Sequence, residues 1–246
     1  GISMSSAKKP LVTSRLLKRV THHGLRSFGE YYRLLVSGAV REEPQIAIDL
    51  LTTNETYFFR EPKHFAFLRE RALKTRRTGI AYRVWSAASS SGEEPWSIAM
   101  TLADALPDAP WEIVASDLST RVLERARSAH YAMERAEHIP QAMLKKYCLR
   151  GVGSQAGTFL IVPALRQRVH FQQVNLVQPL PNLGSFDLIF LRNVLIYFDP
   201  PTKEKVVRQL CERLRPGGYF FCGHSESLHG MDLPLNAVQP AIYLRK

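Results

Sequence analysis

Acidic side chains follow two β-type runs of the sequence, at positions where a sheet could present them to a ligand. The first run is AYRVWSAA at 81–88, and Glu93 and Glu94 open the helical segment after it. The second run is WEIVASD at 111–117, which ends in Asp117. Ligands of open parallel sheets bind at the carboxyl ends of the strands, so we expect these three carboxylates to face one binding site.

The loop SAASSSG at 86–92 indicates the kind of ligand that this site could take. Its small residues let a ligand approach the backbone, but it holds one glycine and lacks the GxGxxG pattern of dinucleotide sites. Glu93 and Glu94 would repel a pyrophosphate, whereas Asp117 lies where an acid commonly binds ribose hydroxyls. A ribose beside a positive centre indicates S-adenosylmethionine (AdoMet), because its sulfonium and ammonium groups favour nearby carboxylates.

Each of these acids also has a purely structural interpretation. Glu93 and Glu94 could stabilise the dipole of the helix that they open. Asp117 could cap the helix that follows it. Taken one at a time, the residues leave both interpretations open.

The elements that must position these residues alternate between strand and helix. Segments 93–106 and 119–131 have helical patterns, while 186–193 and 217–226 are further buried strands with the helix 201–216 between them. This alternation predicts parallel βαβ units and therefore an α/β, Rossmann-like fold with a mostly parallel sheet.

Three regions fall outside that alternation. Short helical patterns predict an N-terminal helical domain with its linker over residues 5–70, ahead of the α/β domain at 71–246. Short β-type runs separated by glycines predict a small antiparallel β-subdomain at about 147–173. The last residues, AIYLRK, are expected to form an edge strand.

Composition narrows the class of protein further. The chain has 246 residues, 45% of them hydrophobic, which is enough for one core with a small satellite domain. It has no run of eighteen apolar residues, so we expect no transmembrane helix. Three cysteines without CxxC spacing fit a reducing cytoplasm, and eight histidines without an HExxH pair argue against a metal site. We therefore expect a cytoplasmic protein that binds no metal.

Positive charge is concentrated near the N-terminus. The net charge is +11, and seven Lys and Arg residues against one glutamate put six of these charges in residues 1–40. In LVTSRLLKRVTHHGL, Leu16, Leu17 and Val20 form an apolar stripe, with basic residues on the opposite face. This asymmetry favours an acidic partner, whether nucleic acid, membrane or protein, although a solvated basic helix has the same pattern.

Six ordered blocks of the sequence resemble the signature blocks of the CheR family, the chemotaxis receptor glutamate methyltransferases. They are TTNETYFFRE…HF, RVWSAASSSGEEPWSIAM, ASDLS…VLERAR…Y, VNL, FDLIFLRNVLIYFD and PGGYFFCGHSESL. The resemblance runs from about residue 11 to the C-terminus, although the family more often has GCSTGEEPYS in the loop after the first strand. It implies a class I AdoMet-dependent methyltransferase that forms glutamate methyl esters and S-adenosylhomocysteine.

The resemblance implies a role for the segment TTNETYFFRE, which joins the helical region to the α/β domain. Asn54, Thr56 and Arg60 are expected to reach across to the cofactor. Phe58 and Phe59 are expected to anchor the segment by packing. The segment would then close over bound AdoMet.

Further residues of the cofactor site follow from the same resemblance. Glu93 or Glu94 should bind the methionine part and Asp117 the ribose, without a choice between the two glutamates. Four more residues complete the expected cofactor-binding set: Asn175 and Leu176 near the adenine, and Arg192 and Asn193 near the methyl group. Arg60 and Tyr197 are expected to orient the incoming carboxylate and to act as the catalytic residues.

The partner implied by the resemblance is the glutamate-rich helical bundle of methyl-accepting chemoreceptors. A positive face of the N-terminal helical region is expected to dock there through Arg15, Lys18, Arg19 and Arg26. The β-subdomain is expected to bind a C-terminal receptor peptide by strand addition. The protein itself is expected to be a monomer that binds no nucleic acid.

Three other functions fit the sequence less well. A nucleic-acid methyltransferase would usually carry an NPPY-type tetrapeptide, and RNVLIYF does not. A non-catalytic AdoMet-binding module would not need the full polar set from Asn54 to Asn193. An NAD oxidoreductase is disfavoured by the glycine pattern.

Overall fold

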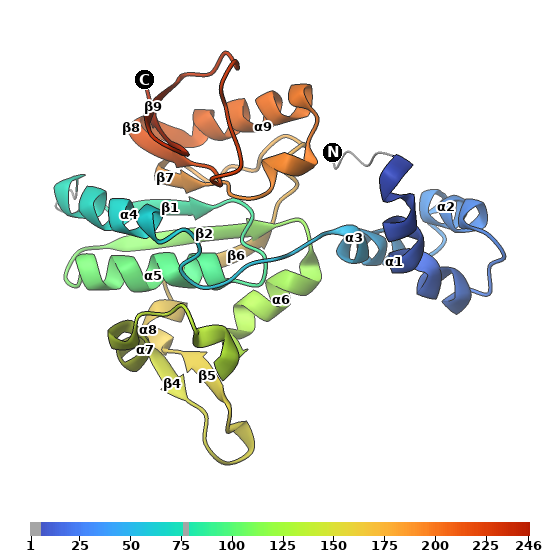
Figure 1. Ribbon diagram of the computed structural model, residues 1–246, viewed down its shortest axis with the longest axis horizontal. Coiled ribbons are helices and arrows are strands. Elements are labelled where there is room, and N and C mark those ends of the chain that lie inside the picture. The colour runs from blue at the N-terminus through green and yellow to red at the C-terminus, as the bar shows by residue number, and fades with distance from the viewer. Residues whose placement is uncertain (1–5, 76–78) are drawn as a thin grey trace.

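The centre of the protein is a seven-stranded, mostly parallel sheet (Figure 1). The structure is a computed structural model that describes residues 6–75 and 79–246. The strands lie in the order β6–β2–β1–β7–β8–β10–β9. Their bounds are β1 (Tyr82–Ser86), β2 (Trp111–Asp117), β6 (Val169–Gln173), β7 (Phe186–Phe190), β8 (Leu214–Phe221), β9 (Leu235–Gln239) and β10 (Ile242–Arg245). All pairings among β6, β2, β1, β7 and β8 are parallel, which confirms the predicted fold class.

Helices cover both faces of this sheet (Figure 1). α4 (Pro62–Thr75) and α5 (Glu93–Ala105) pack on one face, and α9 (Pro200–Arg213) packs on the other. Successive residues of β1 enter the two cores in turn, since Val84 lies under α4 and α5 while Trp85 lies on the side of α9. The remaining helices of this domain are α6 (Thr120–Ser128), α7 (Gln141–Tyr147) and α8 (Pro163–Arg166).

The strand order creates a switch point beside β1. The chain leaves β1 for β2 on one side and later returns to form β7 on the other side. Loops that leave the carboxyl ends of β1 and β7 therefore diverge, and the space between them is where open α/β sheets bind ligands.

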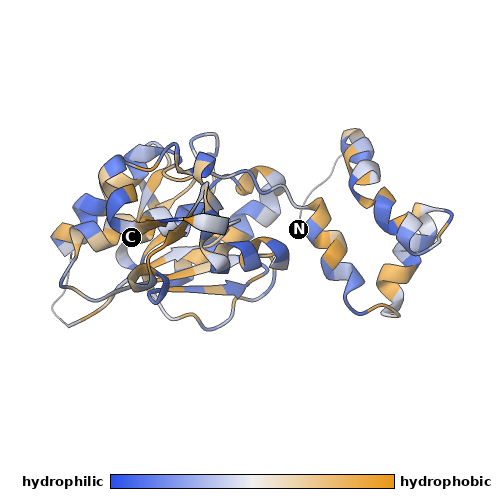
Figure 2. Ribbon diagram, turned by 90° about the horizontal axis from the view of Figure 1, so that it is seen from below, coloured by the Kyte–Doolittle hydropathy of each residue, from blue (hydrophilic) through white to orange (hydrophobic). Residues whose placement is uncertain are grey.

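The N-terminal helices form a separate lobe at one end of the molecule, as Figure 1 and Figure 2 both show. The lobe consists of α1 (Lys9–His22), α2 (Phe28–Ser37) and α3 (Glu43–Leu51), around a small core that includes Leu16 and Val20. Leu17 was expected on the same apolar stripe, but its side chain is 51% exposed. One stripe of a short helix is enough to cover so small a core, which leaves Leu17 outside it.

A buried carboxylate ties the three helices of this lobe together. Glu43 of α3 is fully buried, and its Oε1 accepts hydrogen bonds from Arg19 Nε of α1 at 2.8 Å and from Tyr31 Oη of α2 at 2.6 Å. His23 Nε2 lies 2.9 Å from the other carboxylate oxygen. Hydrogen bonds from Arg19 are the main cause that lowers the pKa of Glu43 to about 2. The lobe thus depends on an ion pair as well as on its small core.

The predicted boundary between the domains differs from the observed one. Residue 5 lies outside the described residues, and the helical lobe ends at Leu51. A strap, residues 52–61, then crosses to α4, which packs on the sheet and so belongs to the α/β domain. Helical periodicity reveals that α4 is a helix, but not which core its apolar face covers.

Phe58 and Phe59 anchor the strap, as expected from the sequence. Phe58 has no exposed surface and lies edge-on to Tyr131 with the ring centroids 5.1 Å apart. Phe59 packs against Phe65, and its backbone N–H donates to Ser97 Oγ at 2.9 Å. The strap is therefore fixed to the α/β domain by apolar packing.

A second, three-stranded antiparallel sheet is present, but its limits differ from the predicted 147–173. Its order is β3 (His130–Ala132), β5 (Thr158–Ile161) and β4 (Cys148–Arg150). The strand β6 at the end of the predicted range instead pairs in parallel with β2. Neighbouring β-type runs look alike in sequence, and only the long-range pairing assigns β3 to the small sheet and β6 to the large one.

The C-terminal strand β10 is not an edge strand. It lies between β8 and β9, antiparallel to both. The edge strand on this side of the sheet is β9, whose sequence LNAVQ lacks a clear alternating pattern and whose residues are mostly exposed. Among the described helices, none combines the length and the apolar character that a membrane span needs.

The Glu43 cluster gives a stability prediction. Glu43→Gln removes the charge that Arg19 needs, and we expect it to lower the free energy of unfolding of the helical lobe by about 3 kcal/mol. The wild-type contribution is complete above the ordinary glutamate pKa and is lost as the pH falls toward about 2, where the buried Glu43 is protonated. Urea unfolding followed by circular dichroism measures both effects.

The matched control is Glu70→Gln on the surface of α4. Glu70 pairs with Lys74 at 2.7 Å, but both side chains are largely exposed. Its loss should change stability by less than about 0.5 kcal/mol. Equal effects of the two substitutions would contradict a special role for Glu43.

Candidate active site

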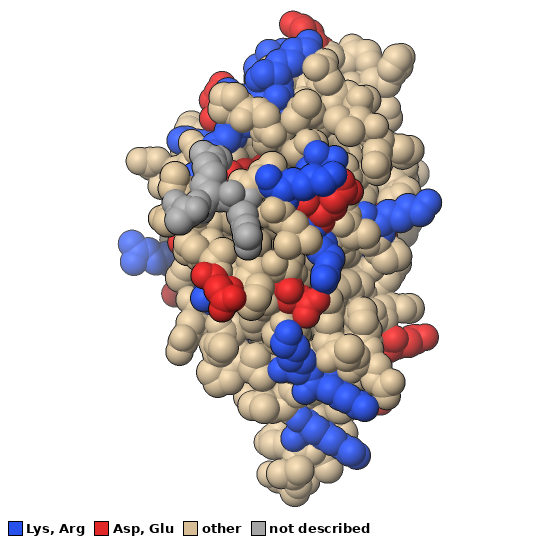
Figure 3. Space-filling model, turned by 90° about the vertical axis from the view of Figure 1, so that its left-hand side faces the viewer, with Lys and Arg blue, Asp and Glu red and all other residues tan. Residues whose placement is uncertain are grey.

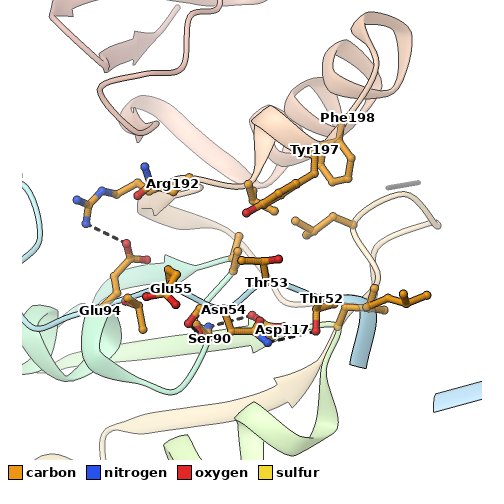
Figure 4. Close-up of a pocket in the computed structure, with 18 of the residues that line it drawn as sticks. Thr52, Thr53, Asn54, Glu55, Ser90, Glu94, Asp117, Arg192, Tyr197 and Phe198 are labelled. Carbon is orange, nitrogen blue, oxygen red and sulfur yellow. Dashed lines mark hydrogen bonds and ion pairs between the residues drawn. The ribbon is translucent and has the colours of Figure 1, made fainter. Parts of the chain in front are cut away.

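A cleft opens at the carboxyl ends of β1, β2 and β7, between the sheet and the helical lobe. Lys8 and Leu11 contribute from the lobe, the strap crosses one side, and loops after the strands form the floor. Figure 4 shows side chains of the strap, the loop after β1 and the loop after β7 turned toward this common space. Ten residues predicted for the site line the cleft: Asn54, Thr56, Arg60, Glu94, Asp117, Asn175, Leu176, Arg192, Asn193 and Tyr197.

Asp117 at the end of β2 is held by two backbone amides. Its Oδ2 accepts from Ser90 N at 2.9 Å, a bond drawn in Figure 4, and its Oδ1 accepts from Ser119 N at 3.0 Å. The helix α6 is capped by the side chain of Ser119, which accepts from Val122 N. Burial raises the pKa of Asp117, although these amides oppose the shift. A carboxylate that is costly to keep ionised and that lines a cleft is typical of a binding site.

Glu94 lines the cleft beside Arg192. Its Oε2 lies 3.0 Å from Arg192 Nη1 (Figure 4), and its Oε1 accepts from Ser86 Oγ at 2.7 Å. Burial raises the pKa of Glu94 despite the attraction of Arg192. A cationic ligand in the cleft would stabilise the ionised form of Glu94, and AdoMet has such positive groups in its sulfonium and ammonium.

Glu93 was predicted for the cofactor site together with Glu94, but it does not line the cleft. Its Oε2 accepts from Ser91 Oγ at 2.7 Å, and its Oε1 pairs with Arg135. Arg135 in turn donates to the backbone oxygen of Thr56 in the strap at 3.1 Å. Adjacent helical residues point in directions about 100° apart, so only one of the two glutamates can face the ligand.

The polar residues of the strap lie across the loop after β1. Ser90 Oγ donates to the backbone oxygen of Asn54 at 3.1 Å, and the side chain of Asn54 donates to Thr52 Oγ1 at 3.2 Å. Arg60 Nη1 donates to the backbone oxygen of Glu55 at 3.0 Å. The strap thus forms one wall of the cleft, while the expected contacts of Asn54, Thr56 and Arg60 with a cofactor stay predictions.

A buried glutamate shapes the loop after β7, which carries Asn193 and Tyr197. Glu226 accepts hydrogen bonds from the backbone N–H groups of Asn193 at 2.8 Å, Leu195 at 2.7 Å and Gly223 at 2.6 Å. Asn193 has a left-handed backbone with φ of 59°, a conformation that asparagine tolerates better than most residues. Sequence reasoning missed Glu226, although it belongs to the block PGGYFFCGHSESL.

Asn175 and Leu176 follow β6 at the far end of the cleft. Asn175 Oδ1 accepts from Val177 N at 3.2 Å, which fixes the turn, and Leu176 is 8% exposed. Leu118 and Val174 add apolar surface to the same lining. An apolar end of this kind fits a flat aromatic base, so the predicted adenine site is consistent with the lining.

The four basic residues predicted for partner binding differ in their surroundings. Arg19 is engaged with Glu43, and Arg15 donates to the backbone oxygen of Leu51 at 2.8 Å and to Thr53 Oγ1 at 3.0 Å. Lys18 and Arg26 are exposed. The helical period places Arg15, Lys18 and Arg19 on the surface of the lobe, and Arg26 lies in the connection between α1 and α2. The pattern does not reveal that Arg15 and Arg19 stabilise the lobe and its junction with the strap.

A further cluster, Glu61, His64 and His224, lies behind Arg192. Glu61 Oε2 is 3.0 Å from Arg192 Nη2, 2.8 Å from His224 Nδ1 and 3.3 Å from His64 Nδ1. These are ligand types that a metal ion could use, although the three residues do not form an HExxH motif. The guanidinium of Arg192 on the same oxygen opposes a dication, so an ion pair explains the cluster better.

The cleft as a whole fits AdoMet. Asp117 offers acceptors for ribose hydroxyls, Glu94 offers a negative charge for a cationic group, and Leu176 contributes to an apolar end for the base. The small residues Ala87 and Ala88 line the floor between them, where a larger side chain would occupy the space. Fold and cleft together define an AdoMet-dependent methyltransferase of the α/β class.

Comparison with known proteins supports this class and narrows it. The family description "CheR methyltransferase, SAM binding domain" matches residues 54–243, and "CheR methyltransferase, all-alpha domain" matches residues 1–52. The chain therefore belongs to the CheR methyltransferase family and uses AdoMet as its methyl donor. The two matched domains meet at the observed junction of helical lobe and strap.

Three relatives illustrate how much of the chain this similarity covers. The chemotaxis protein methyltransferase of Salmonella typhimurium is 44% identical over 94% of this chain and 80% of its own length. Chemotaxis protein methyltransferase 2 of Pseudomonas aeruginosa is 44% identical over 99% and 87%. The chemotaxis protein methyltransferase of Escherichia coli is 44% identical over 94% and 81%.

The raised pKa values of Glu94 and Asp117 predict a pH dependence of cofactor binding. Both carboxylates should be ionised to bind AdoMet, so its affinity should be constant well above their pKa values and fall on acidification. Below the pKa of each carboxylate that must be ionised, protonation of that group should lower the affinity for AdoMet by about tenfold per pH unit. Isothermal titration calorimetry from pH 7.5 to pH 5 measures it.

Glu94→Gln provides the comparison for this measurement. The variant should bind AdoMet more weakly at pH 7.5 and should lose part of the pH dependence, because one titrating group is gone. A Glu94→Gln affinity and pH profile identical to those of the wild type would contradict the assignment of Glu94 to the site.

Proposed function

We propose that the chain transfers a methyl group from AdoMet to glutamate side-chain carboxylates of chemoreceptors in the cytoplasm. The products are glutamate methyl esters and S-adenosylhomocysteine. The observation that carries this proposal is the cleft in which Glu94, Asp117 and Arg192 form the floor while Arg60 and Tyr197 line the same opening. The names of the relatives as chemotaxis protein methyltransferases support the choice of receptor.

The proposed reaction needs alignment more than acid–base catalysis. A glutamate with an ordinary pKa of about 4.3 is already an anion near neutral pH, so no base has to remove a proton. Bound AdoMet supplies an activated methyl group. The residues of the chain then have to hold the acceptor carboxylate in line and exclude water, and such positioning can lower a barrier by roughly 7–11 kcal/mol.

Arg60 and Tyr197 are the residues that we assign to the acceptor carboxylate. The guanidinium of Arg60 is held at the strap by the backbone oxygen of Glu55 and lies 5.7 Å from the ring centroid of Tyr57. Tyr197 lies across the cleft in the loop after β7, with Lys8 Nζ 5.6 Å from its ring centroid. An acceptor that enters between strap and loop would meet both side chains.

We assign the docking of the receptor bundle to the helical lobe. A glutamate-rich helical bundle is acidic, and Lys18 and Arg26 are the exposed residues of the predicted set, whereas Arg19 is paired with Glu43 and Arg15 is hydrogen-bonded to Leu51 and Thr53. On the face of the molecule shown in Figure 3, basic and acidic side chains are mixed. The exposed Lys18 and Arg26 would attract an acidic partner to the lobe.

The small antiparallel sheet supports a proposal for a second receptor contact. β4 is at the edge of this sheet, and Leu149 within it is 50% exposed. Val152 just beyond β4 is 78% exposed. An extended receptor C-terminal peptide could add to this edge by backbone hydrogen bonds and cover these side chains.

The first test is a methyl-transfer assay with methyl-labelled AdoMet and a cytoplasmic receptor fragment. Alkali should release labelled methanol, because glutamate methyl esters hydrolyse while N-methyl and nucleic-acid products do not. Arg60→Ala should lower the rate by about 100-fold, because it leaves the acceptor misaligned. Its free energy of unfolding should change by less than about 1 kcal/mol, since the side chain is half-buried and its backbone contacts remain.

Arg69→Ala is the matched control for this test. Arg69 is a half-exposed arginine on α4 that pairs with Asp104 away from the cleft. The methyl-transfer rate of the Arg69→Ala variant should equal that of the wild type. An alkali-stable product would contradict the proposed chemistry, and an unchanged rate in Arg60→Ala would remove that residue from the site.

The second test concerns docking. The double variant Lys18→Glu and Arg26→Glu should lower kcat/KM at low ionic strength by about tenfold, and added salt should reduce the difference because it screens exposed charges. Lys74→Glu at the far end of α4 is the control and should have little effect. A wild-type rate without any salt dependence would contradict electrostatic docking on the lobe.

A further inference from the structure

Arg192 is the only residue of the cleft floor, within the described part of the chain, that is paired with two carboxylates. Its Nη1 lies 3.0 Å from Glu94 Oε2 and its Nη2 lies 3.0 Å from Glu61 Oε2. Nη2 also donates to the backbone oxygen of Arg60. The side chain of Arg192 is 2% exposed, so its charge acts in a poorly screened environment.

The backbone places Glu61 in this position at a conformational cost. Phe59 and Glu61 both have left-handed backbones, with φ of 54° and 60°. Non-glycine residues rarely adopt this conformation, and it persists where surrounding contacts determine it. His224 supplies such contacts, because its backbone N–H donates to Glu61 Oε1 at 3.2 Å and its Nδ1 lies 2.8 Å from Oε2.

The buried His64 does not compete with Arg192 for the negative charge of Glu61. His64 is 1% exposed, and burial together with the charge of Arg192 lowers its pKa to about 3, so it is neutral near pH 7. Burial tends to raise the pKa of Glu61, but Arg192 and His224 outweigh it and lower the value to about 2. Glu61 is therefore ionised, and it neutralises Arg192 from the side away from the cleft.

The pairing of Glu61 with Arg192 determines the net charge at the floor of the cleft. If Glu94 alone had to neutralise Arg192, the floor of the cleft would be close to neutral. With Glu61 present, Arg192 and its two carboxylates together carry one net negative charge. AdoMet has a positive sulfur, whereas its product S-adenosylhomocysteine has a neutral one, so an uncompensated negative charge favours AdoMet.

We propose that Glu61 is a positioning residue that neutralises Arg192 and thereby sets the preference of the cleft for a cationic over a neutral adenosyl ligand. Glu61 does not line the cleft itself and acts through Arg192. The inference rests on AdoMet as the methyl donor and deepens the proposed function, since it names a residue that affects discrimination between donor and product.

The test is a set of calorimetric titrations of the full chain with AdoMet, sinefungin and S-adenosylhomocysteine, in buffer with EDTA to exclude metal ions. Sinefungin carries an amine cation in place of the methyl sulfonium. Glu61→Gln should weaken the binding of AdoMet and sinefungin by roughly tenfold relative to S-adenosylhomocysteine, through the loss of one nearby charge. A purely structural role would weaken all three ligands alike.

Two shorter side chains at the same position provide a matched pair. Glu61→Asp and Glu61→Asn have nearly the same size, and both residues tolerate a left-handed backbone. The aspartate should keep the preference for cationic ligands, and the asparagine should lose it. Glu70→Gln, which removes an exposed charge on α4, should leave all three affinities unchanged.

The outcomes separate this inference from the proposed function. Equal ligand preferences in the aspartate and asparagine variants would overturn the role of Glu61 even if AdoMet binds tightly and methyl transfer proceeds. Wild-type protein that binds none of the three ligands would contradict the AdoMet site and this inference together. A preference that follows the charge at position 61 across all variants would support it.

Discussion

The arrangement of the cleft depends on the buried guanidinium of Arg192. It joins the loop after β7 to Glu94 at the start of α5, and to Glu61 and the backbone of Arg60 in the strap. A buried ion pair of this kind contributes little net stability, but the loss of one partner leaves an uncompensated charge. The strap is therefore held across the strand ends by an interaction that also determines the charge of the site.

The carboxylates of the cleft and the carboxylate of the helical lobe differ in the direction of their pKa shifts. Burial raises the pKa values of Glu94 and Asp117 because the charged groups lose hydration, while Arg192 and the backbone amides oppose the shift. Glu43 in the helical lobe has the opposite shift, because its hydrogen bonds with Arg19 and Tyr31 are complete. A lowered pKa with complete internal partners is typical of a structural carboxylate, whereas raised pKa values in a cleft are typical of carboxylates at a binding site.

Much of the fold and the site could be predicted from the sequence, because local patterns carry that information. The alternation of strands and helices predicted the α/β class. The signature blocks of the sequence predicted ten residues that line the cleft. What failed depends on long-range pairing: β10 lies inside the sheet, and β6 belongs to the large sheet. The sequence also could not show that Glu93 turns toward Arg135 while Glu94 lines the cleft, or that the partners of Arg15 and Arg19 come from α3 and the strap.

The central claim is that the floor formed by Asp117, Glu94 and Arg192 holds the adenosyl cofactor. A crystal structure of the chain with S-adenosylhomocysteine tests it most directly. The account predicts the ribose hydroxyls at the carboxylate of Asp117, the methionine part beside Glu94, and the base between the loops near Leu176. A ligand bound outside this cleft would contradict the account. A ligand that contacts Glu93 and makes no contact with Glu94 would contradict it as well.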